Sequence, residues 1–294
     1  MAADLASILY QFGTNAAFLL LSALGLIVIL GMMNLINLAH GEFMMLGAYV
    51  ATMVVHLGVP FALAVIVAFI AIALFGIVLE RLVIRRFYGR ELGALVTTWG
   101  ISLILAQGAL LVFGPYMPPI PIPGGSVAVG TYSFSIYWLV LIAISLLLVG
   151  GLAFLYRATS FGLQARAAMQ NPDMARSLGI RVDRIYMLTF GLGAGLAGLS
   201  GALLAPTTSI APYMGQQFVA PAFITVVVGG GANVIAGALG SSSFLSLVET
   251  PVSLTLGTFY GTMALLVMAL LIIRVLPGGI SSMRLRWLRS VVAR

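Results

Sequence analysis

The strongest constraint on this chain is a repeating pattern in which long, charge-free apolar runs alternate with short clusters of arginine. An uncharged apolar run of about 18 residues or more is long enough to cross a bilayer as a helix. Hydrophobic residues make up 62% of the sequence and charged residues only 7%, whereas roughly 25% of residues are charged in soluble domains. The pattern therefore predicts a polytopic membrane protein and excludes an ordinary soluble domain.

The fourteen basic residues are all arginine, and most of them lie at the ends of apolar runs. Basic residues that flank membrane helices stay on the cytoplasmic side, so segments 81–91, 157–184 and 274–294 are predicted to be cytoplasmic. The uncharged, proline-containing segments 114–135 and 205–221 are expected outside. The arginines form no continuous basic face, so the net charge of +7 does not indicate a nucleic-acid partner. Without lysine, the chain cannot form a Walker A phosphate loop.

The apolar runs predict one membrane domain over residues 1–294 with about eight transmembrane helices, some of them broken or re-entrant. Helices are expected throughout, because an open sheet edge cannot exist in hydrocarbon. Two stretches are ambiguous: 34–57 contains a polar interruption, and 222–256 divides at 229–233 into two pieces that are each short for a full crossing. The clearer spans are 16–33, 60–79, 92–113, 136–156, 185–204 and 259–273.

Residues 34–42 form the densest polar cluster within an apolar region. Such side chains are costly in lipid unless they face protein or a water-filled cavity. Gly41 allows a local helix break, and the free N–H groups and dipole of a broken helix suit a carboxylate ligand. A cytoplasmic turn with helix-capping side chains explains the cluster equally well. The candidate pathway or gate residues in this cluster are Asn34, Asn37, His40 and Glu42.

Trp99 and Glu249 extend this candidate set. Trp99 either lines the pathway or packs at the membrane interface, and Glu249 either lines the pathway or lies at the outer surface. Pro251, beside Glu249, can break the helix there. The only two histidines, His40 and His56, lie sixteen residues apart, which argues against a zinc site. No catalytic set of side chains occurs at credible spacing, so the sequence predicts no metal site and no enzyme.

The stretch 193–198 matches the dinucleotide-binding spacing GxGxxG, but no strand precedes it and it lies inside an apolar run. Small residues three or four positions apart let membrane helices approach closely. Gly191, Gly195 and Gly198 are therefore interpreted as helix-packing residues.

The cytoplasmic segment 157–184 contains a well-bounded short helix. Asn171 is a good N-cap, Pro172 suits the first helical position, and Gly179 is a natural stop. Met174 and Leu178, four residues apart, give this helix an apolar face. The face is predicted to dock into a groove on a soluble partner, and lying flat on the membrane is the alternative.

Several of these segments resemble one known family. Residues 37–49, Asn-Leu-Ala-His-Gly-Glu-Phe-Met-Met-Leu-Gly-Ala-Tyr, look like the signature of the Liv-type permeases, the membrane subunits of bacterial branched-chain amino acid ABC importers. Segments 166–179, 189–193 and 226–231 resemble the same family, and the likeness covers nearly the whole chain. Of the two paralogous permease subunits, the chain resembles the shorter, LivH-like one.

The resemblance implies a bacterial inner-membrane complex with a second permease subunit (LivM-like), two cytoplasmic ABC ATPases and a periplasmic solute-binding protein. ATP is then used by the partner subunits, and this chain binds no cofactor of its own. The helix at 172–178 would belong to the region that receives the ATPase stroke. The residues expected in this coupling role are Arg166, Asn171, Asp173, Met174, Arg176 and Leu178.

The substrate class stays open at this point. Branched-chain amino acids lead, but residues 98–105, Thr-Trp-Gly-Ile-Ser-Leu-Ile-Leu, resemble urea permeases of the same fold, so urea or a short amide is the alternative. An ion-driven secondary transporter would need intramembrane acidic residues to bind its ion, and only Glu42 and Glu249 are available. A membrane scaffold without transport activity would not need the polar cluster at 34–42.

Overall fold

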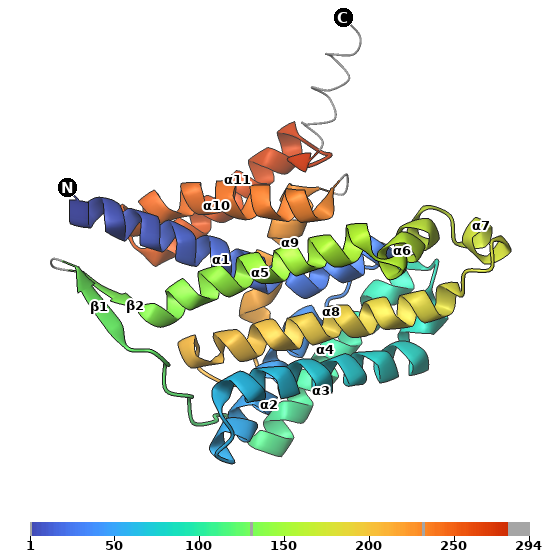
Figure 1. The fold of residues 1–294 in the computed structure, drawn as a ribbon, viewed down its shortest axis with the longest axis horizontal. Coiled ribbons are helices and arrows are strands. Elements are labelled where there is room, and N and C mark those ends of the chain that lie inside the picture. Colours follow the sequence, from blue (N-terminus) through green and yellow to red (C-terminus); the bar gives the residue numbers. More distant parts are fainter. Residues whose placement is uncertain (1, 130–131, 231–232, 282–294) are drawn as a thin grey trace, which may run out of the picture. The chain divides into compact units, whose positions relative to one another are not determined.

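The computed structural model describes residues 2–129, 132–230 and 233–281, and these are mostly helical (Figure 1). A two-stranded antiparallel hairpin, β1 (Ser126–Val129) and β2 (Tyr132–Ser135), precedes α5. Two short 3-10 turns are η1 (Ile84–Phe87) and η2 (Ala205–Thr207). The α-helices are α1 (Ala2–Met33), α2 (His40–His56), α3 (Phe61–Leu82), α4 (Glu91–Phe113), α5 (Ile136–Ala158), α6 (Ser160–Gln170), α7 (Pro172–Ser177), α8 (Val182–Leu204), α9 (Gln216–Gly229), α10 (Val234–Leu256) and α11 (Thr258–Val275).

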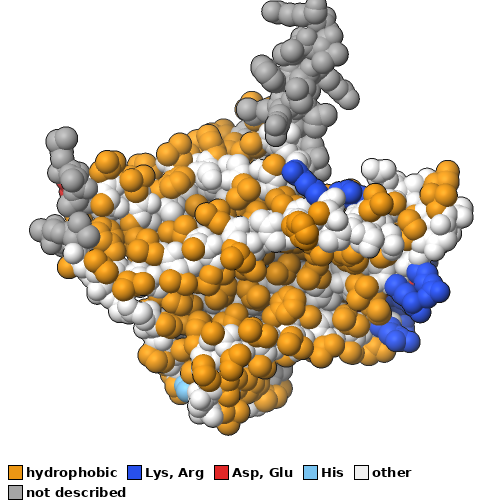
Figure 2. Space-filling view, viewed as in Figure 1, with side chains coloured by type: hydrophobic (Ala, Val, Ile, Leu, Met, Phe, Trp, Pro, Cys, Tyr) orange, Lys and Arg blue, Asp and Glu red, His pale blue; other side chains and the backbone are white. Residues whose placement is uncertain are grey.

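Six of the described helices, α1, α3, α4, α5, α8 and α11, are long and apolar enough to cross a membrane. Helix α2 has 17 residues and α9 has 14, so both are shorter than a usual span. Hydrophobic side chains cover most of the face seen in Figure 2, and the basic side chains visible there gather in a few places. The chain is therefore an all-α polytopic membrane protein, as the sequence predicts.

The structure differs from the predicted elements in three places. Helix α1 begins at Ala2, well before the expected start at residue 16; its first turns contain Asp4, Ser7 and Gln11 and so do not belong to the uninterrupted apolar run. The hairpin of β1 and β2 and the helix α6 were not expected at all. Helix α10 continues through Pro251 to Leu256, so the proline does not break the helix there. Within membranes, neighbouring groups and local adjustments satisfy the backbone that a proline frees.

Helix α10 has 23 residues and so is not too short to cross, unlike the pieces expected within 222–256. The predicted dividing point of that stretch includes Gly231 and Ala232, which lie outside the described residues. So do Arg284, Arg286, Arg289 and Arg294 of the predicted cytoplasmic tail.

The chain forms two compact units, each assembled from separated segments. The larger comprises residues 24–121 and 152–220, and the smaller comprises 1–23, 122–151 and 221–294. The smaller unit is built around the α10–α11 pair, with a core of Leu19, Val228, Leu245, Leu265, Ala269 and Ile272. Within it, the backbone of Gly229 packs directly on Gly237, so α9 and α10 approach closely where α9 ends.

In the larger unit, α3 and α8 lie side by side (Figure 1) and make the most extensive helix contact. Glycines of α8 allow this approach. A Cβ on Gly191 would lie 2.5 Å from Ile77 Cγ1, one on Gly195 2.8 Å from Ala73 Cβ, and one on Gly198 2.6 Å from Ile72 Cβ. The three glycines therefore lie at a helix–helix interface, where small residues let backbones come together.

The two ends of the larger unit differ in character. At one end the α3–α4 connection meets the segment after α5, where Arg85 forms an ion pair with Asp183. At the other end Met117 N donates a hydrogen bond to Ile210 O, at 3.2 Å, and Gln107 Nε2 donates to the Tyr213 hydroxyl, at 3.0 Å. The arginine-rich segments thus share one end and the uncharged loops share the other, which agrees with the sides of the membrane that the arginine pattern predicts.

Candidate functional site

Helix α2 begins well inside the helical bundle of the larger unit. After α1 ends at Met33, a non-helical segment precedes α2, and Leu38 N in it donates a hydrogen bond to Thr98 Oγ1, at 3.2 Å. Thr98 is seven residues from the start of α4 at Glu91, or about 10 Å along the helix axis. The non-helical segment between α1 and α2 therefore lies beside α4, so the two helices are separated within the bundle, as the halves of a broken helix are.

Three polar side chains gather at the start of α2 and are shielded from solvent. Asn37 and His40 are 0% exposed and Glu42 is 1% exposed. Asn37 Oδ1 accepts a hydrogen bond from Ala39 N, at 3.1 Å, and the Ser102 hydroxyl donates to the Glu42 carboxylate. Among the described residues, Asn37 Nδ2 and Glu42 Oε2 have no hydrogen-bond partner. The cluster therefore contains a buried N–H donor and a buried carboxylate acceptor without partners. Burying such groups costs free energy unless a ligand or water forms hydrogen bonds with them.

The start of α9 lies directly against this cluster. A Cβ on Gly41 would overlap the carbonyl oxygen of Gly215, the residue immediately before α9. Ala39, the N-cap of α2, supplies no side-chain cap. The first turns of two helices, each with unsatisfied N–H groups and the positive end of its dipole, are thus brought together within the bundle. This arrangement can stabilise a negatively charged group.

The other predicted pathway residues do not join this cluster. Asn34 is exposed, with φ of 50°, and lines a separate pocket. Trp99 is 56% exposed on the outer face of α4. Glu249 is partly buried in α10, which belongs to the smaller unit. Of the five candidates in the larger unit, Asn37, His40 and Glu42 are brought together.

A pocket of about 410 Å³ opens at the arginine-rich end of the larger unit. Its walls come from the end of α1 and residues 33–36, from the α3–α4 connection, and from α7 and α8. Asn34, Arg90, Glu91 and Arg176 are its polar lining residues. Residues 34–36 line this pocket and directly precede Asn37 in the chain, whereas Asn37, His40 and Glu42 do not line it.

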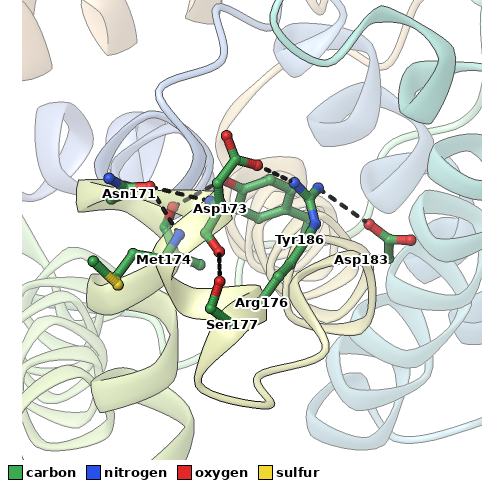
Figure 3. Close-up of polar contacts among 8 residues, drawn as sticks. Asn171, Asp173, Met174, Arg176, Ser177, Asp183 and Tyr186 are labelled. Atoms are coloured by element: carbon green, nitrogen blue, oxygen red, sulfur yellow. Dashed lines mark hydrogen bonds and ion pairs between the residues drawn. The ribbon is translucent and has the colours of Figure 1, made fainter.

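The short helix α7 has the bounds that the sequence predicts. Asn171 Oδ1 accepts hydrogen bonds from Asp173 N, at 3.1 Å, and Met174 N, at 3.0 Å, as an N-cap does (Figure 3). The helix ends before Gly179, whose φ of 82° is the left-handed conformation expected of a helix stop. Helix α6, one residue upstream, has its own N-cap, Thr159, which accepts from Gly162 N.

Arg176 anchors α7 to the start of α8. Its guanidinium lies between two carboxylates, 2.9 Å from Asp173 Oδ1 and 3.7 Å from Asp183 Oδ1 (Figure 3). Met174 and Leu178 remain 59% and 73% exposed. The ion pairs orient a small helix whose apolar side chains point away from the rest of the chain.

Arg166, predicted to act in coupling, contacts Tyr156 at the end of α5. Its Nη1 donates to Tyr156 O, at 2.6 Å, and its guanidinium lies 5.1 Å from the centre of the Tyr156 ring. The side chain therefore fixes α6 to the end of α5. The coupling role of Arg166 stays a prediction.

Sequence reasoning missed a second buried carboxylate. Glu80 is 1% exposed in α3 and accepts a hydrogen bond from the Tyr88 hydroxyl. Burial, together with this hydrogen bond, raises the pKa of Tyr88 well above its usual range, so the hydroxyl keeps its proton and remains a donor. The position of Glu80 inside an apolar run was the available signal, but the adjacent Arg81 made it look like part of the exposed cytoplasmic end.

A bundle of membrane-length apolar helices with a buried polar cluster at a helix start is an arrangement typical of transport permeases. The model of the family "branched-chain amino acid transport system / permease component" matches residues 8–276. The chain therefore belongs to this family. No solved structure matches it.

Two curated relatives extend over most of the chain. The high-affinity branched-chain amino acid transport system permease protein LivH of Salmonella typhimurium is 31% identical over 277 residues, which cover 88% of this chain and 90% of the relative. The corresponding permease BraD of Pseudomonas aeruginosa is 27% identical over the same shares of the two chains. The autoinducer 2 import system permease protein LsrC of Klebsiella pneumoniae is 31% identical over 55% of this chain and 48% of the relative.

Proposed function

We propose that the chain is the inner-membrane permease subunit of an ABC importer that carries branched-chain amino acids. The names of the LivH and BraD relatives support this substrate class. The chain contains no lysine, which a Walker A loop requires. Two cytoplasmic ATPases would therefore supply the energy for transport. The chain would assemble with a second, LivM-like permease and receive its substrate from a periplasmic solute-binding protein.

The observation that carries the transport proposal is the cluster at the start of α2. An amino acid in transit bears a carboxylate, and the converging first turns of α2 and α9 offer N–H groups and positive dipole ends for it. The unpartnered Glu42 Oε2 is an acceptor of the kind an ammonium group requires. Glu42 and Asn37 would thus contact the polar end of the substrate as it passes.

Helix α7 is proposed to transmit the conformational change of the ATPase to the permease. Its exposed Met174 and Leu178 would bury their side chains in the ATPase subunit, which contributes about 1.5–3 kcal/mol for each fully buried side chain. Because Arg176 pairs with Asp183 at the start of α8, a displacement of α7 would be passed to α8. Helix α8 packs on both α2 and α3, so the motion would reach the polar cluster.

Competition for uptake tests the substrate class. The importer, reconstituted into proteoliposomes with its ATPases and binding protein, should take up labelled leucine only when ATP is present. Excess valine or isoleucine should abolish leucine uptake, and excess urea or acetamide should leave it unchanged. Uptake of urea in place of leucine would favour the amide alternative, and leucine uptake driven by an ion gradient without ATP would favour a secondary transporter.

A further inference from the structure

A second pocket, distinct from the one that Asn34 lines, lies between the arginine-rich ends of α3 and α8. Its volume is about 490 Å³. Its lining contains one carboxylate, Asp183, and five arginines: Arg81, Arg85, Arg176, Arg181 and Arg184. A concave site with this ratio of charges has a strongly positive potential, which attracts anions.

The single carboxylate does not neutralise the pocket. Asp183 pairs with Arg85 and, at 3.7 Å, with Arg176. Within the described part of the chain, Arg81, Arg181 and Arg184 form no ion pair with an acidic side chain, and all three are exposed. Helix α8 adds to the potential, because it begins at Val182 without a side-chain cap and the positive end of its dipole faces the pocket.

The pocket continues a lipid-facing surface of α3. Ile70, Leu74, Val78 and Leu82 follow one another at intervals of four residues and are 50–58% exposed, as expected for a helix face in contact with acyl chains. Arg81 follows Val78 by three residues and so lies on the same side. On α8, Leu188 is 45% exposed and lies one turn from Arg184.

The depth of these arginines in the membrane follows from the helices that carry them. Arg81 is in the last turn of the span Phe61–Leu82, and Arg181 and Arg184 flank the start of the span that begins at Val182. Guanidiniums at the ends of spans lie at the level of the lipid headgroups. Arginine binds phosphate in a bidentate manner, with several N–H donors in one plane.

We propose that this pocket binds the phosphate headgroup of an anionic phospholipid of the cytoplasmic leaflet. Arg81 and Arg184 hold the phosphate from α3 and α8, and Arg181 adds to the positive charge. The acyl chains lie on the exposed apolar residues of α3 and on Leu188. The continuity of the pocket with that apolar surface favours a lipid over an acidic patch of the ATPase, which would not need it. Basic pockets between membrane helices bind anionic headgroups in this way.

The test measures binding of short-chain phosphatidylglycerol to the purified permease complex by thermal shift and native mass spectrometry. Phosphatidylglycerol should bind and raise the melting temperature, whereas phosphatidylcholine of the same chain length and inorganic phosphate alone should do neither. The double variant R81Q/R184Q should bind phosphatidylglycerol about 30-fold more weakly, since each arginine near a membrane surface contributes a factor of about five in affinity. R81K/R184K, which retains both charges but loses the bidentate contacts, should bind with an affinity between those of the wild type and R81Q/R184Q.

The matched control is R86Q/R157Q, which removes two exposed arginines that are predicted to face the cytoplasm but do not line this pocket. It should bind phosphatidylglycerol as the wild type does. Equal weakening in both double variants, or equal stabilisation by phosphatidylcholine or by inorganic phosphate, would overturn the proposal. So would loss of the ATPase from R81Q/R184Q with lipid binding unchanged, because the pocket would then be a protein-docking surface.

Discussion

Gly41 and Gly215 meet backbone to backbone, so that a Cβ on either residue would overlap the other chain segment. Gly41 is in the first turn of α2, and Gly215 immediately precedes α9. This contact brings two helix starts together beside Asn37 and Glu42. It explains how a bundle of apolar helices can present N–H groups to a solute in its interior.

The first prediction concerns this contact. Gly41→Ala should separate α2 from α9, because the added methyl group has no space, and overpacking of this kind costs about 1–3 kcal/mol. Leucine uptake should fall, and the melting temperature of the purified complex should decrease. Gly100→Ala in α4, where a Cβ meets nothing within 4 Å, is the control and should change neither. Wild-type uptake and melting temperature in Gly41→Ala would show that the two helix starts are not tightly packed.

The second prediction concerns packing between α3 and α8. Gly198→Ala should lower the melting temperature, since its Cβ would lie 2.6 Å from Ile72 Cβ and one helix must move. Gly150→Ala in α5, where a Cβ is unobstructed, should be neutral or stabilising by about 0.4–1 kcal/mol, because alanine restricts the unfolded chain. The melting temperature of Gly198→Ala should therefore lie clearly below that of Gly150→Ala. Identical curves would contradict the close α3–α8 interface.

The third prediction concerns topology. The chain has no cysteine, so single engineered cysteines report their own side of the membrane. Ser126→Cys, in the exposed strand β1, should react with an impermeant thiol reagent added to intact spheroplasts. Ser177→Cys, exposed at the end of α7, should react only after the membrane is opened. The reverse pattern would place the arginine-rich segments outside and would contradict the assigned orientation.

The fourth prediction concerns coupling. Replacing Met174 and Leu178 together with Asp should release the ATPase or uncouple ATP hydrolysis from the binding protein, because charged side chains cannot be buried in an apolar groove. The permease itself should insert normally, since both positions are exposed. Gln170→Glu combined with Ser177→Asp adds the same charge nearby without removing apolar surface and should keep coupling. Binding-protein-stimulated ATPase activity at the wild-type level in the Met174/Leu178 variant would remove α7 from this role.

Much of the fold could be predicted from local signals. The apolar runs gave most spans, and Asn171, Pro172 and Gly179 bounded α7, because capping depends on residues next to each other in the chain. Contacts between distant segments could not be predicted. The approach of Gly41 to Gly215 and the pairing of Arg85 with Asp183 each join segments far apart in the chain. Helix α10 also continues through Pro251, against the local preference of proline.

The candidate site was predicted only in part for the same reason. Asn37, His40 and Glu42 are close in sequence and lie together at one helix start. Asn34, Trp99 and Glu249 were grouped with them only because each is polar or aromatic in an apolar setting. Polarity indicates that a side chain needs a partner, but it does not say which cavity the side chain faces.

The most direct test of the central claim is uptake by the reconstituted importer carrying Glu42→Gln. This change keeps the shape of the side chain and removes its charge, and His40→Ala in a second variant removes its neighbour. Asp4→Asn, at an exposed carboxylate near the start of α1, is the control for loss of a carboxylate elsewhere. If α2 begins at the translocation pathway, initial rates of leucine uptake should fall at least about tenfold in Glu42→Gln and should drop in His40→Ala. The complex should stay assembled in both, and Asp4→Asn should transport normally. Wild-type uptake by both cluster variants, at wild-type expression and assembly, would show that these side chains only cap a helix and do not line the pathway.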